Sequence, residues 1–188
     1  GVAVIELGIS SQKDFDLKKI ATPYLMKLRD ITGETVQLAI LSGDEIILLD
    51  NIEGTGELRF YSPAGLNFSI TYGNFGKIFL MNRDKEHVEN VIDNNPLKKY
   101  TAKSVIDKDL YLEELGKIRE VGYSVGINDP IDGGFAVAAP LYNYEGHVIA
   151  SIALVGPNSK KNIDNIDVIA EMVKKTSLDI SNELGYKI

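Results

Sequence analysis

The sequence predicts an α+β domain with a mostly antiparallel sheet of about six strands and helices packed on its faces. Two observations lead to this class. Short apolar runs separated by turn residues fall into two groups of three, as strands joined by hairpins do. Segments with helical spacing stand before, between and after these groups. The order therefore differs from the βαβ alternation of a dinucleotide-binding fold.

The first half of the chain supplies a helix and the first strand group. Apolar residues repeat with helical spacing over 17–31, and Gly33 ends the helix. Pro23 within this pattern predicts either a kink or a restart with Thr22 as the N-cap. Strands follow over 35–41, 45–52 and 58–61.

The second half begins with a helical insertion and ends with a long helix. We predict helices over 75–81, 85–92 and 107–121, then strands over 123–127, 135–141 and 148–155. Gly146 suits the positive φ of the turn in the last hairpin. An amphipathic helix over 163–184 closes the chain, and Gly185 ends it.

The last hairpin is the most informative segment because its strands carry small side chains where a core usually carries bulk. These residues are Ala136, Ala138, Ala139, Ala150, Ser151 and Ala153. Such a strand pair either lies against a closely packed helix or lines a cavity. The residues alone leave both alternatives open.

Composition limits the class of function. The 188 residues are 44% apolar, enough for the core of one domain. The net charge of −7 and the scattered Lys and Arg residues argue against direct DNA binding. The absence of cysteine excludes thiolate chemistry and Cys-bound zinc. No apolar run has the length of a membrane helix, so we expect a cytoplasmic protein without a membrane partner. The start at Gly1 suggests a processed product or a piece of a longer chain.

The segment 72–77 contains a Gly-Lys pair but does not form a Walker loop. That motif needs a glycine where Thr71 stands and a Ser or Thr where Ile78 stands. What remains is a glycine-containing loop that opens a helix, whose free backbone N–H groups can receive a carboxylate. The alternative is an ordinary turn and helix start.

Catalytic and metal chemistry have little support. His87 and His147 lack a partner at metal-ligand spacing, and no serine stands in a nucleophile-elbow pattern. The loop 128–132 carries Asp129 and Asp132, which either serve the turn or supply polar contacts to a site. A small hydrolase or isomerase using these carboxylates is the enzymatic alternative. We expect no enzyme, no cofactor and no metal.

Six segments taken together resemble a known family. They are LKKIATPYLMKLRDITGETVQLAIL (17–41), ELRFYSPAG (57–65), NFGKIFL (74–80), LEELGKIREVGYSV (112–125), GGFAVAAPLYNYEGHVIASIALVGP (133–157) and DISNELG (179–185). In order and spacing they resemble the C-terminal effector-binding domain of the IclR family of bacterial transcription regulators.

This resemblance implies a GAF-like, profilin-like fold that follows a winged helix-turn-helix domain. Residues 1–16 would then be the end of the interdomain linker, and 17–188 the effector-binding domain. The resemblance also implies a homodimer or homotetramer that contacts DNA only through the N-terminal domain absent from this chain. The effector would be a small organic or aromatic acid, bound between the sheet, the loop before Gly76 and the loop after Ile127. The residues expected to bind it are Phe60, Tyr72, Gly73, Asn74, Phe75, Gly126, Asn128, Asp129, Phe135, Ala136, Ala153 and Val155.

The sequence departs from family members that bind small keto acids. Ala136, Ala153 and Val155 stand where such members carry hydroxyl or thiol groups, Gly126 stands where an acidic residue can occur, and Phe75 replaces a small residue. Each lost hydroxyl removes a hydrogen bond worth about 0.5–1.5 kcal/mol. We therefore expect an acid with an apolar or aromatic body, and neither glyoxylate nor pyruvate.

Two other hypotheses remain open from the sequence. In the first, the Phe75 ring fills the pocket and the domain serves only for assembly. In the second, the chain is a GAF-like sensor of another signalling protein. The first predicts a stable oligomer that binds no ligand.

Overall fold

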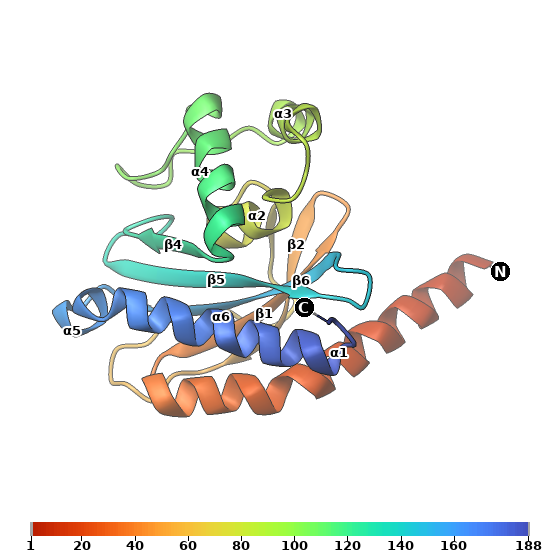
Figure 1. The fold of residues 1–188 in the computed structure, drawn as a ribbon, viewed down its shortest axis with the longest axis horizontal. Helices are drawn as coiled ribbons and strands as arrows, with labels where there is room; N and C mark the ends of the chain where they lie inside the picture. Colours follow the sequence, from red (N-terminus) through yellow and green to blue (C-terminus); the bar gives the residue numbers. More distant parts are fainter. Residues whose placement is uncertain (1, 188) are drawn as a thin grey trace.

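A six-stranded antiparallel sheet of order β3-β2-β1-β6-β5-β4 forms the centre of the structure, a computed structural model that describes residues 2–187 (Figure 1). The strands are β1 (Thr35–Ser42), β2 (Glu45–Ile52), β3 (Asn67–Ser69), β4 (Ser124–Ile127), β5 (Gly134–Tyr142) and β6 (Val148–Pro157). The helices are α1 (Val2–Thr32), α2 (Gly73–Leu80), α3 (Lys85–Asn94), α4 (Lys108–Val121), α5 (Lys160–Asp164) and α6 (Ile166–Glu183). The predicted α+β class and the six-stranded sheet are confirmed.

Two tight hairpins, the antiparallel pairing of the edge strands β3 and β4 with β2 and β5, and one long-range pairing build this sheet. Gly43 and Gly146 adopt positive φ in the turns of the β1–β2 and β5–β6 hairpins, as turn geometry requires. β1 then pairs with β6, with Val36 opposite Leu154, and this pairing joins the two strand groups. Both strand groups therefore share one continuous sheet.

Helices α1 and α6 cover one face of the sheet (Figure 1). Leu25 and Leu28 of α1 and Val173 and Ile180 of α6 are buried there against large strand residues. The Ser181 hydroxyl of α6 accepts a 3.0 Å hydrogen bond from the Tyr142 backbone N–H. This face is a conventional packed core.

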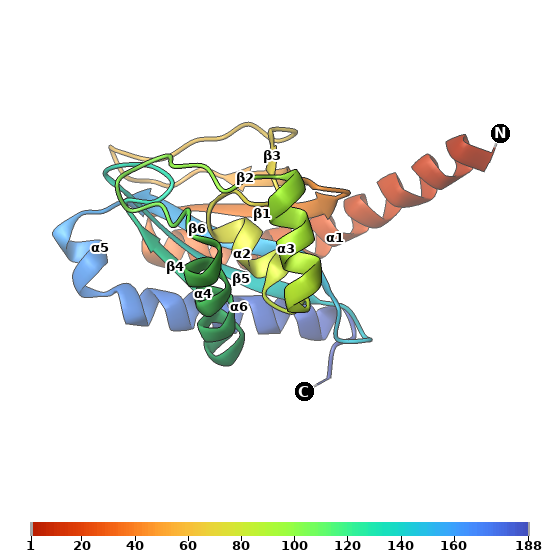
Figure 2. The same cartoon turned by 90° about the horizontal axis from the view of Figure 1, so that it is seen from above.

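Helices α2, α3 and α4 lie over the opposite face (Figures 1 and 2). Asp107 caps α4 by accepting a hydrogen bond from the Leu110 N–H, and Gly122 ends it in the left-handed conformation. Ile78 of α2 and Leu115 of α4 are buried in the core on this side. The helical insertion predicted between the two strand groups is confirmed.

The third strand predicted over 58–61 is wrong. Leu58 and Tyr61 are 71% and 64% exposed, and the segment belongs to a loop. The β2 edge is occupied by residues further along the chain, because β3 pairs with its start and Leu48 exchanges backbone hydrogen bonds with Gly65 and Leu66. The start of the β2 edge is therefore taken by residues 65–69 and not by the predicted strand.

Helix boundaries differ from prediction at both ends of the chain. α1 starts at Val2 and runs through Pro23, so the predicted restart is wrong. Thr22 does not cap a helix but donates its hydroxyl proton to the Lys18 carbonyl oxygen within α1. The closing helix is divided at Asn165, because Ser159 caps the short α5 and α6 begins at Ile166. Within residues 2–187, no helix is both long enough and apolar enough to cross a membrane.

Candidate effector site

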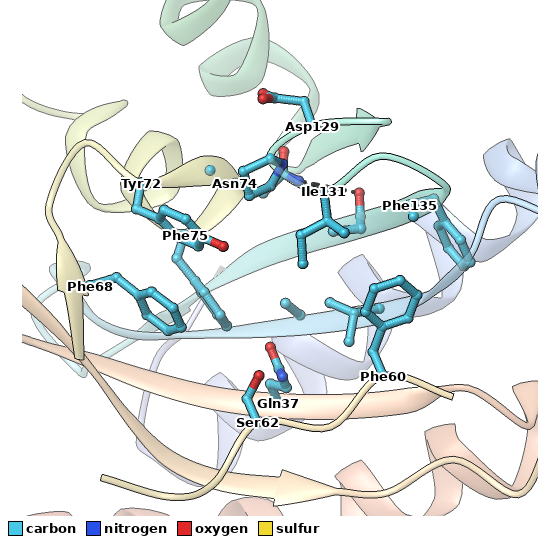
Figure 3. A pocket seen from close by; sticks show the side chains of 16 residues that line it. Gln37, Phe60, Ser62, Phe68, Tyr72, Asn74, Phe75, Asp129, Ile131 and Phe135 are labelled. Atoms are coloured by element: carbon cyan, nitrogen blue, oxygen red, sulfur yellow. Dashed lines mark hydrogen bonds between the residues drawn. The ribbon is translucent and has the colours of Figure 1, made fainter. Parts of the chain in front are cut away.

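A cavity lies between the sheet, the start of α2, the loop after β4 and the loop after β2 (Figure 3). Its empty volume is about 640 Å³ when space out to its open mouth is included. Water-sized molecules can occupy only about 80 Å³ of it, so the cavity is small beside the roughly 300–1,000 Å³ of typical ligand sites. The lining residues are Gln37, Phe60, Ser62, Phe68, Tyr72, Gly73, Asn74, Phe75, Asp129, Pro130, Ile131, Gly134, Phe135, Ala136, Ala153 and Val155.

The floor of the cavity consists of the small strand residues singled out in the sequence. Ala136 of β5 pairs with Val155 of β6, and Ala138 pairs with Ala153. Ala136, Ala153 and Val155 line the cavity. The sequence left open whether the small side chains of this hairpin pack against a helix or line a cavity. At Ala136 and Ala153 they line a cavity.

The start of α2 borders the cavity without a side-chain cap. Tyr72 occupies the N-cap position, and its side chain accepts no hydrogen bond from the first turn. The backbone N–H groups of a first helical turn have no acceptor within the helix. They carry the positive end of the helix dipole, which favours an anionic group at this position.

The side chain of Asn74 fixes the start of α2 to the sheet. Its Oδ1 accepts a 2.5 Å hydrogen bond from the Ser124 hydroxyl, and its Nδ2 donates to the Ala136 carbonyl oxygen. A Cβ at Gly126 would lie 2.6 Å from Asn74 Nδ2, so glycine is needed there. Asn74 therefore positions α2, and Gly126 lies behind it instead of lining the cavity.

Phe75 points into the cavity from α2, where its ring forms one wall (Figure 3). The side chain is 6% exposed and packs in the core beneath α2. It narrows the cavity, and empty volume remains beside it. The ring therefore points into the pocket (Figure 3). The hypothesis of an assembly domain whose pocket is filled by Phe75 requires this orientation.

Aromatic rings close the neighbouring wall. Phe68 and Tyr72 stack with ring centroids 4.4 Å apart, and Tyr100 meets Tyr72 edge-on at 5.1 Å. Burial raises the pKa of the Tyr72 hydroxyl above its ordinary value, and the nearby Tyr100 and Asp129 add to this. Tyr72 therefore presents a neutral hydroxyl and an apolar ring at neutral pH.

The loop after β4 contributes Asp129, while Asn128 holds the loop together. Asn128 has a φ of +58°, and its Oδ1 accepts hydrogen bonds from the Gly133 N–H and the Asn158 side chain. The Asp129 carboxylate accepts a 2.6 Å hydrogen bond from the Ser104 hydroxyl. Asn128 does not line the cavity.

The structure thus brings the predicted residues together, apart from Gly126 and Asn128, which lie behind the wall. The cavity lining contains no Lys or Arg. Lys77, close by in α2, instead forms a 2.8 Å ion pair with Glu114 of α4. An anion in this cavity would therefore depend on the backbone of α2.

Several lining residues were absent from the sequence-based prediction. They are Gln37, Ser62, Phe68, Pro130, Ile131 and Gly134. One signal was available for Gln37, since its amide interrupts the mostly apolar strand 35–41 and alternates onto the face shared with Ala39. The loop residues carried no comparable pattern.

A second hollow lies between α1 and α6 on the other side of the molecule. Its walls include Tyr24, Lys27, Met172 and Lys175. None of the predicted site residues lies there.

Comparison with known proteins supports the same assignment. The family described as "Bacterial transcriptional regulator IclR C-terminal" matches residues 10–182. The HTH-type transcriptional repressor AllR of Escherichia coli is 29% identical over 187 residues, covering 100% of this chain and 69% of AllR. AllR of Salmonella typhi gives the same identity and coverage.

Solved structures agree with the fold. The Thermotoga maritima IclR structure has a TM-score of 0.85 at 26% identity, covering 99% of this chain and 75% of that one. The C-terminal domain of the E. coli regulator KdgR has a TM-score of 0.80 at 23% identity, covering 91% of this chain and 99% of that one.

The fold, the cavity and these matches define the C-terminal domain of a bacterial transcriptional regulator. The chain belongs to the IclR family. The relatives are regulators and not enzymes, which supports a non-enzymatic role and argues against both a hydrolase and another signalling protein.

Proposed function

We propose that this domain senses a small organic acid with an apolar or aromatic body, and thereby modulates operator binding by the full-length regulator. The single observation that carries the proposal is the cavity, whose alanine floor faces an uncapped helix start. Apolar walls with a few convergent polar groups are typical of ligand sites.

The two ends of the cavity suggest how such an acid would lie. The first turn of α2 offers backbone N–H groups to a carboxylate. Ala153, Val155 and Ile131 offer apolar contact to the rest of the molecule. Glyoxylate and pyruvate lack an apolar body of this kind and would make few contacts with these side chains.

Further parts of the proposal concern the assembly. Residues 17–188 would form the sensing domain and 1–16 the end of the linker from a winged helix-turn-helix domain. This is supported by the coverage of AllR, of which the chain spans 69%, and by the N-terminal part of α1, which projects from the body (Figure 2). The domain would act as a dimer or tetramer in the cytoplasm, so that a ligand-favoured arrangement changes the spacing of the DNA-binding domains.

A thermal-shift screen tests the proposal. Benzoate, phenylacetate, hexanoate, pyruvate and glyoxylate are titrated against the wild-type domain and against Ala153→Leu, which places a larger side chain on the cavity floor. Ala102→Leu makes the same change at an exposed position and serves as the control. A ligand at about 100 times its Kd adds roughly 2.7 kcal/mol, which raises Tm by several degrees. We expect this shift with the apolar acids in wild type and control, and its loss in Ala153→Leu.

Two outcomes contradict the proposal. Binding of pyruvate well below millimolar concentration, with no response to the apolar acids, would overturn the ligand class. No response to any acid, with a stable oligomer by light scattering, would favour the assembly domain in which Phe75 occludes the pocket.

A further inference from the structure

The cavity floor is apolar except at one end, where an amide side chain stands. Gln37 of β1 is 7% exposed and lines the cavity, with Ala153 as its neighbour on β6. Figure 3 shows Gln37 rising from the strand toward the cavity, on the side opposite Asn74 and the start of α2. A buried amide in an apolar wall is costly unless its hydrogen bonds are made.

The protein makes some of these hydrogen bonds through a second amide. Asn51 lies directly across from Gln37 on β2, and Gln37 Nε2 donates a 3.0 Å hydrogen bond to Asn51 Oδ1. Within residues 2–187, no group donates to Gln37 Oε1, and the buried Nδ2 of Asn51 has no acceptor. One buried donor of this pair is therefore unsatisfied.

Turning both terminal amides by half a rotation moves the unsatisfied donor from Asn51 to Gln37, on the cavity side of the pair. Asn51 Nδ2 then donates to Gln37 Oε1, and Gln37 Nε2 faces the cavity. Asn51 Oδ1 then occupies the buried position that Nδ2 held, where no hydrogen-bond partner is available. A buried carbonyl oxygen without a partner is better tolerated than a buried N–H without one. The two amides then form a hydrogen-bonded chain that runs from Asn51 through Gln37 to the cavity, and the bonds of such a chain polarise one another.

We propose that Gln37, oriented by Asn51, recognises a hydrogen-bond acceptor on the effector, at the end of the molecule remote from its carboxylate. The chemical class is an organic acid with a second oxygen acceptor, a ketone, amide or carboxylate, separated from the first carboxylate by an apolar body. This inference rests on the proposed function, because it assigns the far end of the same ligand. Gln37 contacts the ligand, and Asn51 is a positioning residue.

A matched pair of acids tests the inference. 4-Acetylbenzoate and 4-ethylbenzoate have nearly the same shape and differ in the carbonyl group, and 5-oxohexanoate and hexanoate repeat the comparison without a ring. The Kd of each acid is measured by calorimetric titration. In wild type we expect the keto acid of each pair to bind about fivefold to tenfold more tightly, the effect of one hydrogen bond.

Variants of Gln37 and Asn51 test whether these two residues cause the tighter binding of the keto acids. In Gln37→Leu the ratio of the two Kd values falls to about one, whatever the absolute affinity of the variant. Asn51→Leu reduces the ratio because Gln37 is no longer oriented, an effect that loss of stability alone would not produce. The double variant Gln37→Leu with Asn51→Leu leaves neither amide unpaired and guards against misfolding of the single variants. It is also expected to show a ratio of about one.

The outcomes separate this inference from the proposed function. If the apolar acids bind but the keto acids have no advantage, or if Gln37→Leu keeps the advantage, the inference is overturned and the proposed function stands. If none of the four acids binds wild type at millimolar concentration, both are overturned.

Discussion

The two faces of the sheet differ although the same strands form both. On the α1–α6 face, Val137 and Leu141 of β5 and Ile152 and Leu154 of β6 are fully buried in a packed core. On the α2 face, the alternate residues of these strands include the small side chains of Ala136, Ala138, Ser151 and Ala153, and the cavity lies above part of them. Successive strand residues point to opposite faces, so one face can be hollow without weakening the other.

The α1–α6 face of the hairpin strands serves mainly for packing, whereas the α2 face of the same strands leaves room for the proposed ligand. On the first face, large aliphatic side chains of the strands fill the space under the helices and add apolar burial that favours folding. The second face gives up volume where the cavity lies, and there it keeps polar groups such as Gln37 and the start of α2. Substitutions on the two faces are therefore expected to have different effects, and neighbouring residues of β6 allow a direct test.

The largest expected effect is that of Leu154→Ala on the packed face. Its side chain is fully buried, and truncation leaves a cavity, which costs about 2–5 kcal/mol. Ala153→Leu, one residue earlier, adds volume beside the cavity, and we expect it to cost less, near the lower end of the about 1–3 kcal/mol of overpacked sites. Urea unfolding of both variants makes the comparison. Equal losses in the two variants would show that the α2 face is as tightly packed as the other.

A smaller effect is expected at the wall behind the cavity. In Gly126→Ala the new Cβ lies 2.6 Å from Asn74 Nδ2 and 2.8 Å from the Asp129 carbonyl oxygen, so the Asn74 side chain and the loop that carries Asp129 must shift. Overpacking of this kind costs about 1–3 kcal/mol and is expected to weaken acid binding as well. The measurements are urea unfolding and the thermal shift with benzoate.

Gly116→Ala is the matched control for this prediction. Gly116 lies within α4, and a Cβ added there would meet no atom within 4 Å outside its own helix turn. Alanine there is expected to stabilise the domain by roughly 0.5–1 kcal/mol through helix propensity. A Gly126→Ala variant as stable as wild type would mean that Asn74 does not tie α2 to the sheet.

Elements defined by local signals could be predicted from the sequence. Both hairpins follow from apolar runs around turns with Gly43 and Gly146, and α4 follows from its periodicity, its cap and Gly122. The loop after β2 could not be predicted, because its apolar alternation suggests a strand. Which segment pairs with the β2 edge is decided by tertiary contacts, and these favour β3.

The sequence predicted the cavity floor and the start of α2. It did not predict Gln37 as a lining residue, and it placed Gly126 and Asn128 in the site although they do not line the cavity. The alanines of 136–153 and the glycine-containing segment 72–76 carry a signal in the residues themselves. The role of Gln37 depends on Asn51 across the strand pair and on the open space above both, so it needs the structure. Gly126 and Asn128 were near the site in sequence, yet their contacts face away from the cavity.

The smallest expected effect concerns a buried hydroxyl under the α2 face. The Tyr111 side chain of α4 is 2% exposed, and its hydroxyl has no hydrogen-bond partner among residues 2–187. Tyr111→Phe keeps the ring and removes this unsatisfied group, so we expect the free energy of unfolding to rise by about 1 kcal/mol at pH 7. Urea unfolding measures the difference between variant and wild type.

The pH dependence sharpens this last prediction. Burial raises the pKa of the Tyr111 hydroxyl well above its ordinary value, and the nearby Glu114 and Asp129 add to this. The unfolded chain ionises this tyrosine near pH 10, about its reference value, while the folded protein keeps the proton. The free energy of unfolding of wild type therefore falls as pH rises above about 10. Tyr111→Phe lacks this contribution, so the difference in free energy of unfolding between variant and wild type increases above about pH 10. If Tyr111→Phe were less stable than wild type at pH 7, the Tyr111 hydroxyl would make a favourable hydrogen bond in the folded protein. The buried polar groups under the α2 face would then have their partners.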